Sequence, residues 1–168
     1  MSEPKQLEVY VLAMQKQAVI LPGDVVAEII PYEPLQRIGD TPDWFLGLLG
    51  WRGIQIPVVS FEMLTVERAS FSLVSVASAS LVIIRGNTDQ ALLPFYALVA
   101  QTHPAAYEVF DEMLFKTGGT VGRTEIAKVR FNNDVLSIPN LDYLEAALIN
   151  PLDRPSLAHS VIPKLPQT

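Results

Sequence analysis

Short hydrophobic runs separated by polar turns dominate the chain, and most of them predict β-strands. The runs are four to nine residues long and rich in β-branched and aromatic residues, and several alternate apolar with polar positions, as half-buried strands do. Polar or glycine-containing stretches such as Gly86–Asp89 and Asn132–Asp134 separate them and indicate tight turns. The expected strands are residues 7–12, 18–21, 25–30, 48–52, 54–59, 81–85, 91–99, 126–131 and 135–138.

Two short helices are expected between these strands. Thr41, Pro42 and Asp43 provide a hydroxyl cap, a proline at the first helical position and an acid in the first turn, and the glycines that follow require this helix to be brief. The second helix is expected at residues 141–148. The serine-rich stretch 65–80 is interpreted as a connection between two halves of the domain.

Two pairs of similar segments occur in the same order along the chain and indicate an internal repeat. Residues 17–22 (QAVILP) resemble residues 90–94 (QALLP), and residues 56–61 (IPVVSF) resemble residues 138–143 (IPNLDY). In both halves the Ile-Pro pair is expected to end a strand and open a short helix. We therefore predict an all-β fold with short helices, in which two SH3-like barrels of about five strands each pack together. The expected organisation is an N-terminal tail at 1–6, one domain at 7–150, and a poorly ordered, proline-rich tail at 151–168.

Composition and charge exclude several classes of function. The 168-residue chain is 49% hydrophobic and carries a net charge of −6, which argues against binding to nucleic acid or to anionic lipid. It contains no cysteine, which excludes disulfides and thiol chemistry. The N-terminus has no signal-peptide pattern, and no apolar run is long enough to cross a membrane. We expect a cytoplasmic protein, monomeric and without direct membrane insertion.

Two isolated charges within apolar segments predict an ion pair. Arg52 lies in the apolar and glycine-rich stretch that runs from Trp44 to Val59, and Glu28 is the single charge in the run 25–30. A guanidinium in such surroundings must either reach water at the Arg52-Gly53 turn or meet an acid. Glu28 is the expected partner.

The same residues resemble motifs of the CheW family of chemotaxis coupling proteins. The family pattern is a strand hairpin, then V-x-E-I, T-P-x-[WF]-[IVL]-x-G, N-L-R-G and I-P-V-[IV]-D-L. The corresponding segments here are Val26-Ala27-Glu28-Ile29, Thr41-Pro42-Asp43-Trp44-Phe45-Leu46-Gly47, Gly50-Trp51-Arg52-Gly53 and Ile56-Pro57-Val58-Val59-Ser60-Phe61. The resemblance is densest over residues 7–64 and looser in the second half.

The resemblance implies two SH3-like barrels and a non-enzymatic adaptor. Such adaptors bind the helical tip of a methyl-accepting chemoreceptor in a groove between the barrels, and the regulatory domain of a CheA-type histidine kinase through barrel edges. Glu28 and Arg52 match a pair near the family's receptor-binding surface, and weaker candidates for partner binding are Ile29, Trp51, Gly53 and Ile54. We favour this role for the pair over a purely fold-stabilising one.

The chain departs from the family pattern at several positions. Gly50 and Trp51 replace the Asn-Leu before the arginine, Ser60 replaces an aspartate, and Ala97 replaces the acid of a V-V-D strand. These departures point to an adaptor of a divergent chemosensory system, for which the ChpC-like adaptors of pilus-linked (twitching) systems are one candidate subtype. They also leave open a decoy that binds receptor or kinase but not both.

No catalytic, cofactor-binding or metal-binding residues are predicted. His103 and His159 have no matching nucleophile or ligand pattern, and Gly118–Gly122 lacks the lysine of a phosphate-binding loop. An alternative from another class is a small-ligand-binding or hydrolytic β-barrel, which would need a lined pocket with convergent polar groups.

Overall fold

The computed structural model describes residues 6–14, 17–66, 76–110, 113–117 and 121–152. Within these residues lie eleven strands, two α-helices and short 3-10 segments, in agreement with the predicted all-β class. The strands are β1 (Gln6–Ala13), β2 (Ala18–Pro22), β3 (Val26–Pro31), β4 (Phe45–Trp51), β5 (Ile54–Val59), β6 (Ser80–Arg85), β7 (Phe95–Ala100), β8 (Ala105–Phe110), β9 (Phe115–Lys116), β10 (Glu125–Phe131) and β11 (Asp134–Pro139). The helical elements are η1 (Gly23–Val25), α1 (Phe61–Val66) and α2 (Leu141–Leu152).

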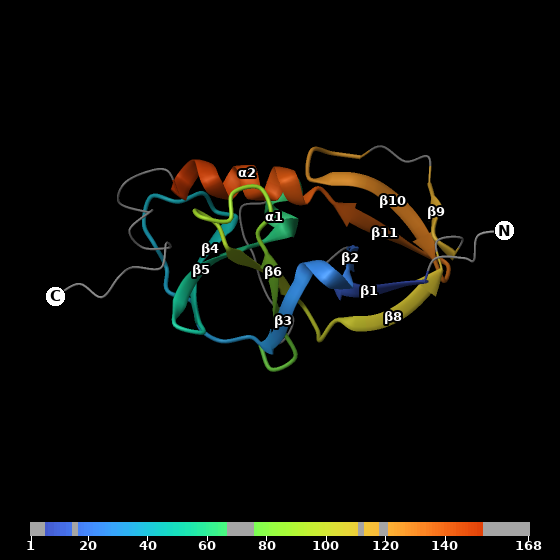
Figure 1. The fold of residues 1–168 in the computed structure, drawn as a ribbon, viewed down its shortest axis with the longest axis horizontal. Coiled ribbons are helices and arrows are strands. Elements are labelled where there is room, and N and C mark those ends of the chain that lie inside the picture. Colours follow the sequence, from blue (N-terminus) through green and yellow to red (C-terminus); the bar gives the residue numbers. More distant parts are fainter. Residues whose placement is uncertain (1–5, 15–16, 67–75, 111–112, 118–120, 153–168) are drawn as a thin grey trace.

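The strands form two packed sheets that correspond to the two SH3-like subdomains (Figure 1). One sheet has six strands in the order β8-β1-β2-β11-β10-β9, and the other has five in the order β3-β6-β7-β5-β4. The N-terminal hairpin β1–β2 therefore completes the sheet made by the C-terminal strands, while β3 to β7 form the other sheet. We call these the six-stranded and five-stranded lobes.

The two lobes repeat one topology, as the internal repeat predicted. In the five-stranded lobe, β5 of the hairpin β4–β5 pairs in parallel with β7 of a second hairpin. In the six-stranded lobe, β11 of the hairpin β10–β11 pairs in parallel with β2 in the same way. The hairpin turns, Arg52-Gly53 and Asn132-Asn133, both have positive φ at their two central residues. Both hairpins also carry a bulge at the same distance from the turn. Five strands of each lobe are therefore equivalent in order, and β9 has no counterpart in the five-stranded lobe.

The sequence matches that suggested this repeat are, however, out of register. Counted from the two turns, Ile56 is equivalent to Leu136 rather than to Ile138. Pro57 lies inside β5, so its Ile-Pro pair does not end a strand, whereas Pro139 does end β11. Residues 90–94 precede β7 and are not equivalent to β2. The repeat is real, but its two Ile-Pro pairs do not mark equivalent positions.

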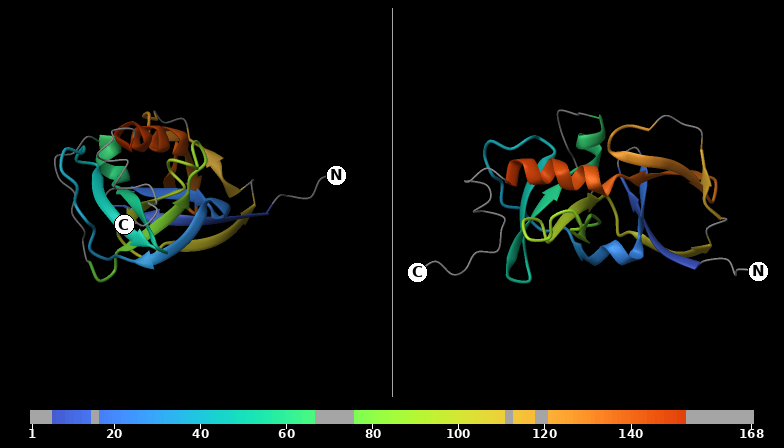
Figure 2. Two further views of the ribbon diagram at one scale, coloured as in Figure 1. Left: turned by 60° about the vertical axis from the view of Figure 1, so that its left-hand side comes forward. Right: turned by 45° about the horizontal axis from the view of Figure 1, so that its top comes forward.

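A shared core joins the two lobes. Leu21 of the six-stranded lobe, Phe45 and Leu98 of the five-stranded lobe, and Leu144 and Leu148 of α2 belong to a single buried cluster. Helix α2 follows β11 of the six-stranded lobe but lies along the five-stranded one (Figures 1 and 2). Burying its apolar face there ties the last strand of one lobe to the core of the other.

Two expectations about individual elements were wrong, and strands β8 and β9 were missed. No helix forms at residues 41–43, because the Thr41 hydroxyl donates to the carbonyl of Ile38 (3.0 Å) instead of capping, and β4 begins at Phe45. Strand β7 begins at Phe95 rather than at residue 91, because Asp89 holds the amides of Leu92 and Leu93 in a turn.

The predicted connection at residues 65–80 does not run between the lobes. It follows α1 and leads into β6, and the strands on either side of it, β5 and β6, belong to the same five-stranded sheet. Its residues 67–75 lie outside the described part of the chain, as do residues 1–5 and 153–168 of the predicted tails. Residues 151–152 end α2, which extends past its predicted end. Among the described helices, none is long and apolar enough to span a membrane.

Candidate functional site

The predicted ion pair forms where the two edges of the five-stranded sheet meet. Glu28 lies on β3 and Trp51 ends β4, which are opposite edges of this sheet. The Glu28 carboxylate oxygen Oε1 accepts hydrogen bonds from Trp51 Nε1 (2.8 Å) and from a guanidinium nitrogen of Arg52 (3.2 Å). Side chains therefore close the sheet on itself. We call Glu28, Trp51 and Arg52 the closing cluster.

Aromatic contacts fix the orientation of the guanidinium. The Arg52 guanidinium carbon lies 4.8 Å from the centroid of the Trp51 ring, within the range of a cation–π contact. The Trp51 ring in turn packs edge-on against Phe95, with centroids 4.8 Å apart. Because Trp51 is only 8% exposed while the Arg52 side chain is 68% exposed, a buried ring supports a charge presented to solvent.

The backbone of Arg52 supports a role beyond stability. Arg52 has φ of 49°, a left-handed conformation that costs a side chain other than glycine or asparagine roughly 1 kcal/mol. The equivalent residue in the other lobe is Asn132, which tolerates this conformation. An exposed ion pair contributes about 0–1 kcal/mol and an exposed cation–π contact about 0.5–1 kcal/mol, which together do little more than offset that cost. Stability alone therefore does not favour arginine at this turn.

The other residues predicted to bind a partner do not all lie at the closing cluster. Gly53 is exposed in the turn, and Ile54 is half-buried against the core of the five-stranded lobe. Ile29 packs against the shared core instead, so its side chain lies apart from the cluster.

Two departures from the family pattern are buried. Ser60 caps α1, its hydroxyl accepting a hydrogen bond from the Met63 amide (3.2 Å), and it is 1% exposed. An aspartate can serve the same capping role, so this replacement preserves the local structure. Ala97 is fully buried in the central strand β7. Neither residue is positioned to contact a partner directly.

A second polar cluster, centred on Glu145, was missed in the sequence. Glu145 on α2 is 1% exposed, and its Oε1 accepts hydrogen bonds from the amides of Asn87 (2.9 Å) and Thr88 (2.7 Å). Its Oε2 accepts a hydrogen bond from the Tyr96 hydroxyl (3.1 Å), and burial, together with the Glu145 charge, raises the pKa of Tyr96 well above its ordinary value. The spacing of Leu141, Glu145 and Leu148 on one helical face was the signal that could have placed this carboxylate inside.

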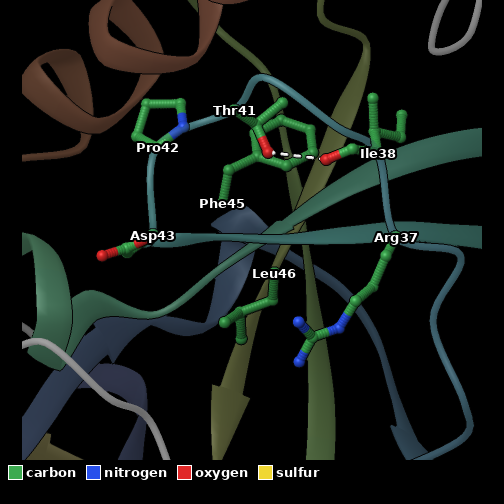
Figure 3. Close-up of a pocket in the computed structure, with 7 residues that line it drawn as sticks. All are labelled: Arg37, Ile38, Thr41, Pro42, Asp43, Phe45 and Leu46. Atoms are coloured by element: carbon green, nitrogen blue, oxygen red, sulfur yellow. Dashed lines mark hydrogen bonds between the residues drawn. The ribbon is translucent and has the colours of Figure 1, made fainter.

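A small pocket at the start of β4 and in the loop before it shares no lining residue with either cluster (Figure 3). It has a volume of about 170 Å³, and Arg37 and Asp43 stand on different sides of it, well separated in the view. Its Thr41 hydroxyl is already bonded to the Ile38 carbonyl. In the described part of the chain, no group of three or more His, Cys, Asp or Glu residues is placed to hold a metal ion.

Comparison with known proteins identifies a family and a fold. The model of the CheW-like domain matches residues 8–105. No curated protein matches the sequence. The crystal structure of the scaffolding protein TtCheW from Thermoanaerobacter tengcongensis is similar, with a TM-score of 0.65, 14% identity, and coverage of 83% of this chain and 87% of that one. Because the family match ends at the first residue of β8, only the structural similarity extends to the strands beyond it.

Proposed function

This chain belongs to the CheW-like domain family, and we propose that it is a non-enzymatic, cytoplasmic adaptor that couples a chemoreceptor to a CheA-type histidine kinase. The family match and the two-lobed fold shared with a scaffolding protein support this role. Such an adaptor acts through a coupling free energy rather than a reaction, because simultaneous binding makes kinase activity depend on receptor conformation.

The observation that carries the proposal is the presentation of Arg52 at the closing cluster. Its guanidinium is exposed, is held by Glu28 and Trp51, and is kept in a backbone conformation unfavourable for arginine. We propose that Arg52, Glu28, Gly53 and Ile54 contact the receptor tip directly. Trp51, whose ring is buried, supports these side chains from inside the five-stranded lobe. Ile29 packs against the shared core, and we propose that it contributes to partner binding from that side.

The proposal is tested by titrating the full chain calorimetrically with a receptor-tip hairpin and with a kinase regulatory domain from the same genome. Arg52→Glu should weaken receptor binding at least tenfold and leave kinase binding within about twofold. Arg130→Glu is the matched control, since Arg130 is an exposed arginine on β10 of the other lobe.

Each pattern of binding has a distinct meaning. No binding of wild type to either partner would refute the adaptor role. Binding to one partner alone would indicate a decoy. Equal receptor binding by wild type and a folded Arg52→Glu would remove Arg52 from the receptor surface while leaving the adaptor role in place.

We also propose that the adaptor serves a divergent, pilus-linked (ChpC-like) system, in keeping with its departures from the family pattern, of which Trp51 is one. The indole N–H of Trp51 donates a hydrogen bond to the Glu28 carboxylate. The leucine of the family pattern has no such donor, so the Glu28 and Arg52 side chains are held differently at this surface. Deletion of the gene should then impair twitching and leave swimming unchanged. A swimming defect alone would assign the protein to a flagellar system.

A further inference from the structure

The six-stranded lobe contains an open, apolar cavity that the adaptor role does not use. It has a volume of about 420 Å³, within the range of small-molecule sites. Its apolar wall is formed by Leu7 and Val9 of β1, Ile20 of β2, Leu114 and Ile138. These five residues also belong to, or pack against, the small core of this lobe, so the cavity opens into the interior of the lobe rather than lying on a flat face.

The cores of the two lobes differ at equivalent positions. Where the five-stranded lobe has Trp51 packed on Phe95, the equivalent positions of the six-stranded lobe hold Phe131 and Ala18. Val129 likewise stands where the other lobe has Leu49. Exchange of large for small side chains at inward positions leaves unfilled volume when the backbone keeps its arrangement. None of these residues of the six-stranded lobe lines the cavity, and Phe131 packs edge-on against Tyr107 with ring centroids 5.3 Å apart, so these exchanges do not account for the cavity.

The polar lining of the cavity carries only negative charge. Besides the apolar wall, the lining includes the exposed residues Gln6, Glu8 and Asp24, and no lysine or arginine. The Glu8 carboxylate lies over Gly23, where an added Cβ would meet its Oε1 at 2.9 Å. Arg85 approaches Asp24 but donates to its main-chain carbonyl (2.8 Å), and among the described residues neither carboxylate is part of an ion pair.

We propose that this cavity binds a small amphipathic cation, whose apolar body fills the lobe and whose ammonium group is held by Glu8 and Asp24. Burial of the apolar body supplies most of the free energy, and the two carboxylates select the charge of the head group. A ligand of about twelve non-hydrogen atoms should bind with a dissociation constant on the order of 1 mM or tighter. This binding is independent of the adaptor role.

The test uses three probes that share one phenylbutyl body and differ in the head group: phenylbutylamine, phenylbutanol and phenylvalerate. Binding to the full chain is followed by amide and methyl chemical shifts in NMR titrations. We expect the amine to bind about tenfold more tightly than the carboxylate, with the alcohol between them, and the largest shifts at Val9, Leu114 and Ile138.

Two kinds of variant distinguish the contribution of the apolar cavity to binding from that of the two carboxylates. The double variant Glu8→Gln and Asp24→Asn should bring amine and carboxylate to within about twofold of each other. The control Glu33→Gln and Asp43→Asn, which alters two exposed acids on the other lobe, should keep the preference. Val9→Phe should abolish binding of all three probes by filling the cavity, and the double variant remains decisive if this core variant does not fold.

The proposal is overturned by equal binding of amine and carboxylate to wild type, by shifts that map outside the six-stranded lobe, or by a preference that survives in the double variant. Binding of none of the probes at 10 mM, a concentration roughly tenfold above the expected constant, would also reject it. None of these results bears on receptor or kinase binding, so the two proposals fail independently.

Discussion

Replacing Glu145 with alanine should destabilise the fold by about 3–5 kcal/mol. The carboxylate accepts three hydrogen bonds, from the amides of Asn87 and Thr88 and from the hydroxyl of Tyr96. A hydrogen bond to a charged group contributes about 1.5–3 kcal/mol. The three share one carboxylate whose burial is itself costly, so the total is smaller than three independent bonds would give.

The assay is urea unfolding, followed by circular dichroism, together with native-state hydrogen exchange. Exchange at the amides of Asn87 and Thr88 should accelerate in Glu145→Ala by more than global unfolding accounts for, because both lose their acceptor. Tyr96→Phe removes one of the three donors and should cost about 1–2 kcal/mol.

The control is Asp142→Ala, which removes an exposed acid from the first turn of the same helix. Only a weak interaction with the helix dipole is lost there, about 0.3–1 kcal/mol. If Glu145→Ala costs no more than Asp142→Ala, or if both loop amides stay protected, the carboxylate does not hold this loop and the reasoning is wrong.

Three further predictions concern the turn, the cap and the buried tyrosine. Arg52→Asn creates the Asn-Gly pair favoured at such a turn, so it should change the free energy of unfolding by less than about 1 kcal/mol in either direction while weakening receptor binding. A loss of more than about 2 kcal/mol in urea unfolding would show that the ion pair is structural. Ser60→Ala should cost about 1 kcal/mol in thermal unfolding, whereas Ser60→Asp should stay near wild type, and equal losses would contradict the capping role. Because the pKa of Tyr96 is raised by burial, the unfolded state loses this proton first, so its contribution to stability is complete below about pH 10 and falls as the pH rises further; Tyr96→Phe should flatten this alkaline decline, and an unchanged pH profile would count against it.

In the closing cluster, the Glu28–Arg52 pair could be predicted from the sequence, whereas the role of Trp51 could not. A single arginine and a single glutamate, each within an apolar segment, were enough to predict the pair, because an isolated charge in such a segment needs a partner or water. The sequence did not reveal that Trp51 would be the buried support of Arg52 rather than an exposed anchor. That depends on the sheet curling until its edge strands meet, a tertiary event.

The hydrogen bonds of the Glu145 cluster could not be predicted from the sequence. Its donors are main-chain amides of a loop more than fifty residues away, and main-chain groups carry no residue-specific signal. Strand β8 was missed because Ala105–Phe110 is half polar or small, and its pairing with β1 is set by a partner about a hundred residues earlier. Long-range pairing of this kind depends on sheet register, which local propensity does not encode.

The strand-rich class, most strand positions and the Glu28–Arg52 pair followed from the sequence, because alternation, turn chemistry and isolated charges act over a few residues. The matches that suggested a repeat joined positions that are not equivalent in the two lobes. Tertiary structure decided that β1 and β2 join the C-terminal strands, that α2 crosses to the other lobe, and that an apolar cavity opens in the six-stranded lobe. Those features depend on which side chains meet across the core, and packing is a property of the assembled chain rather than of any segment.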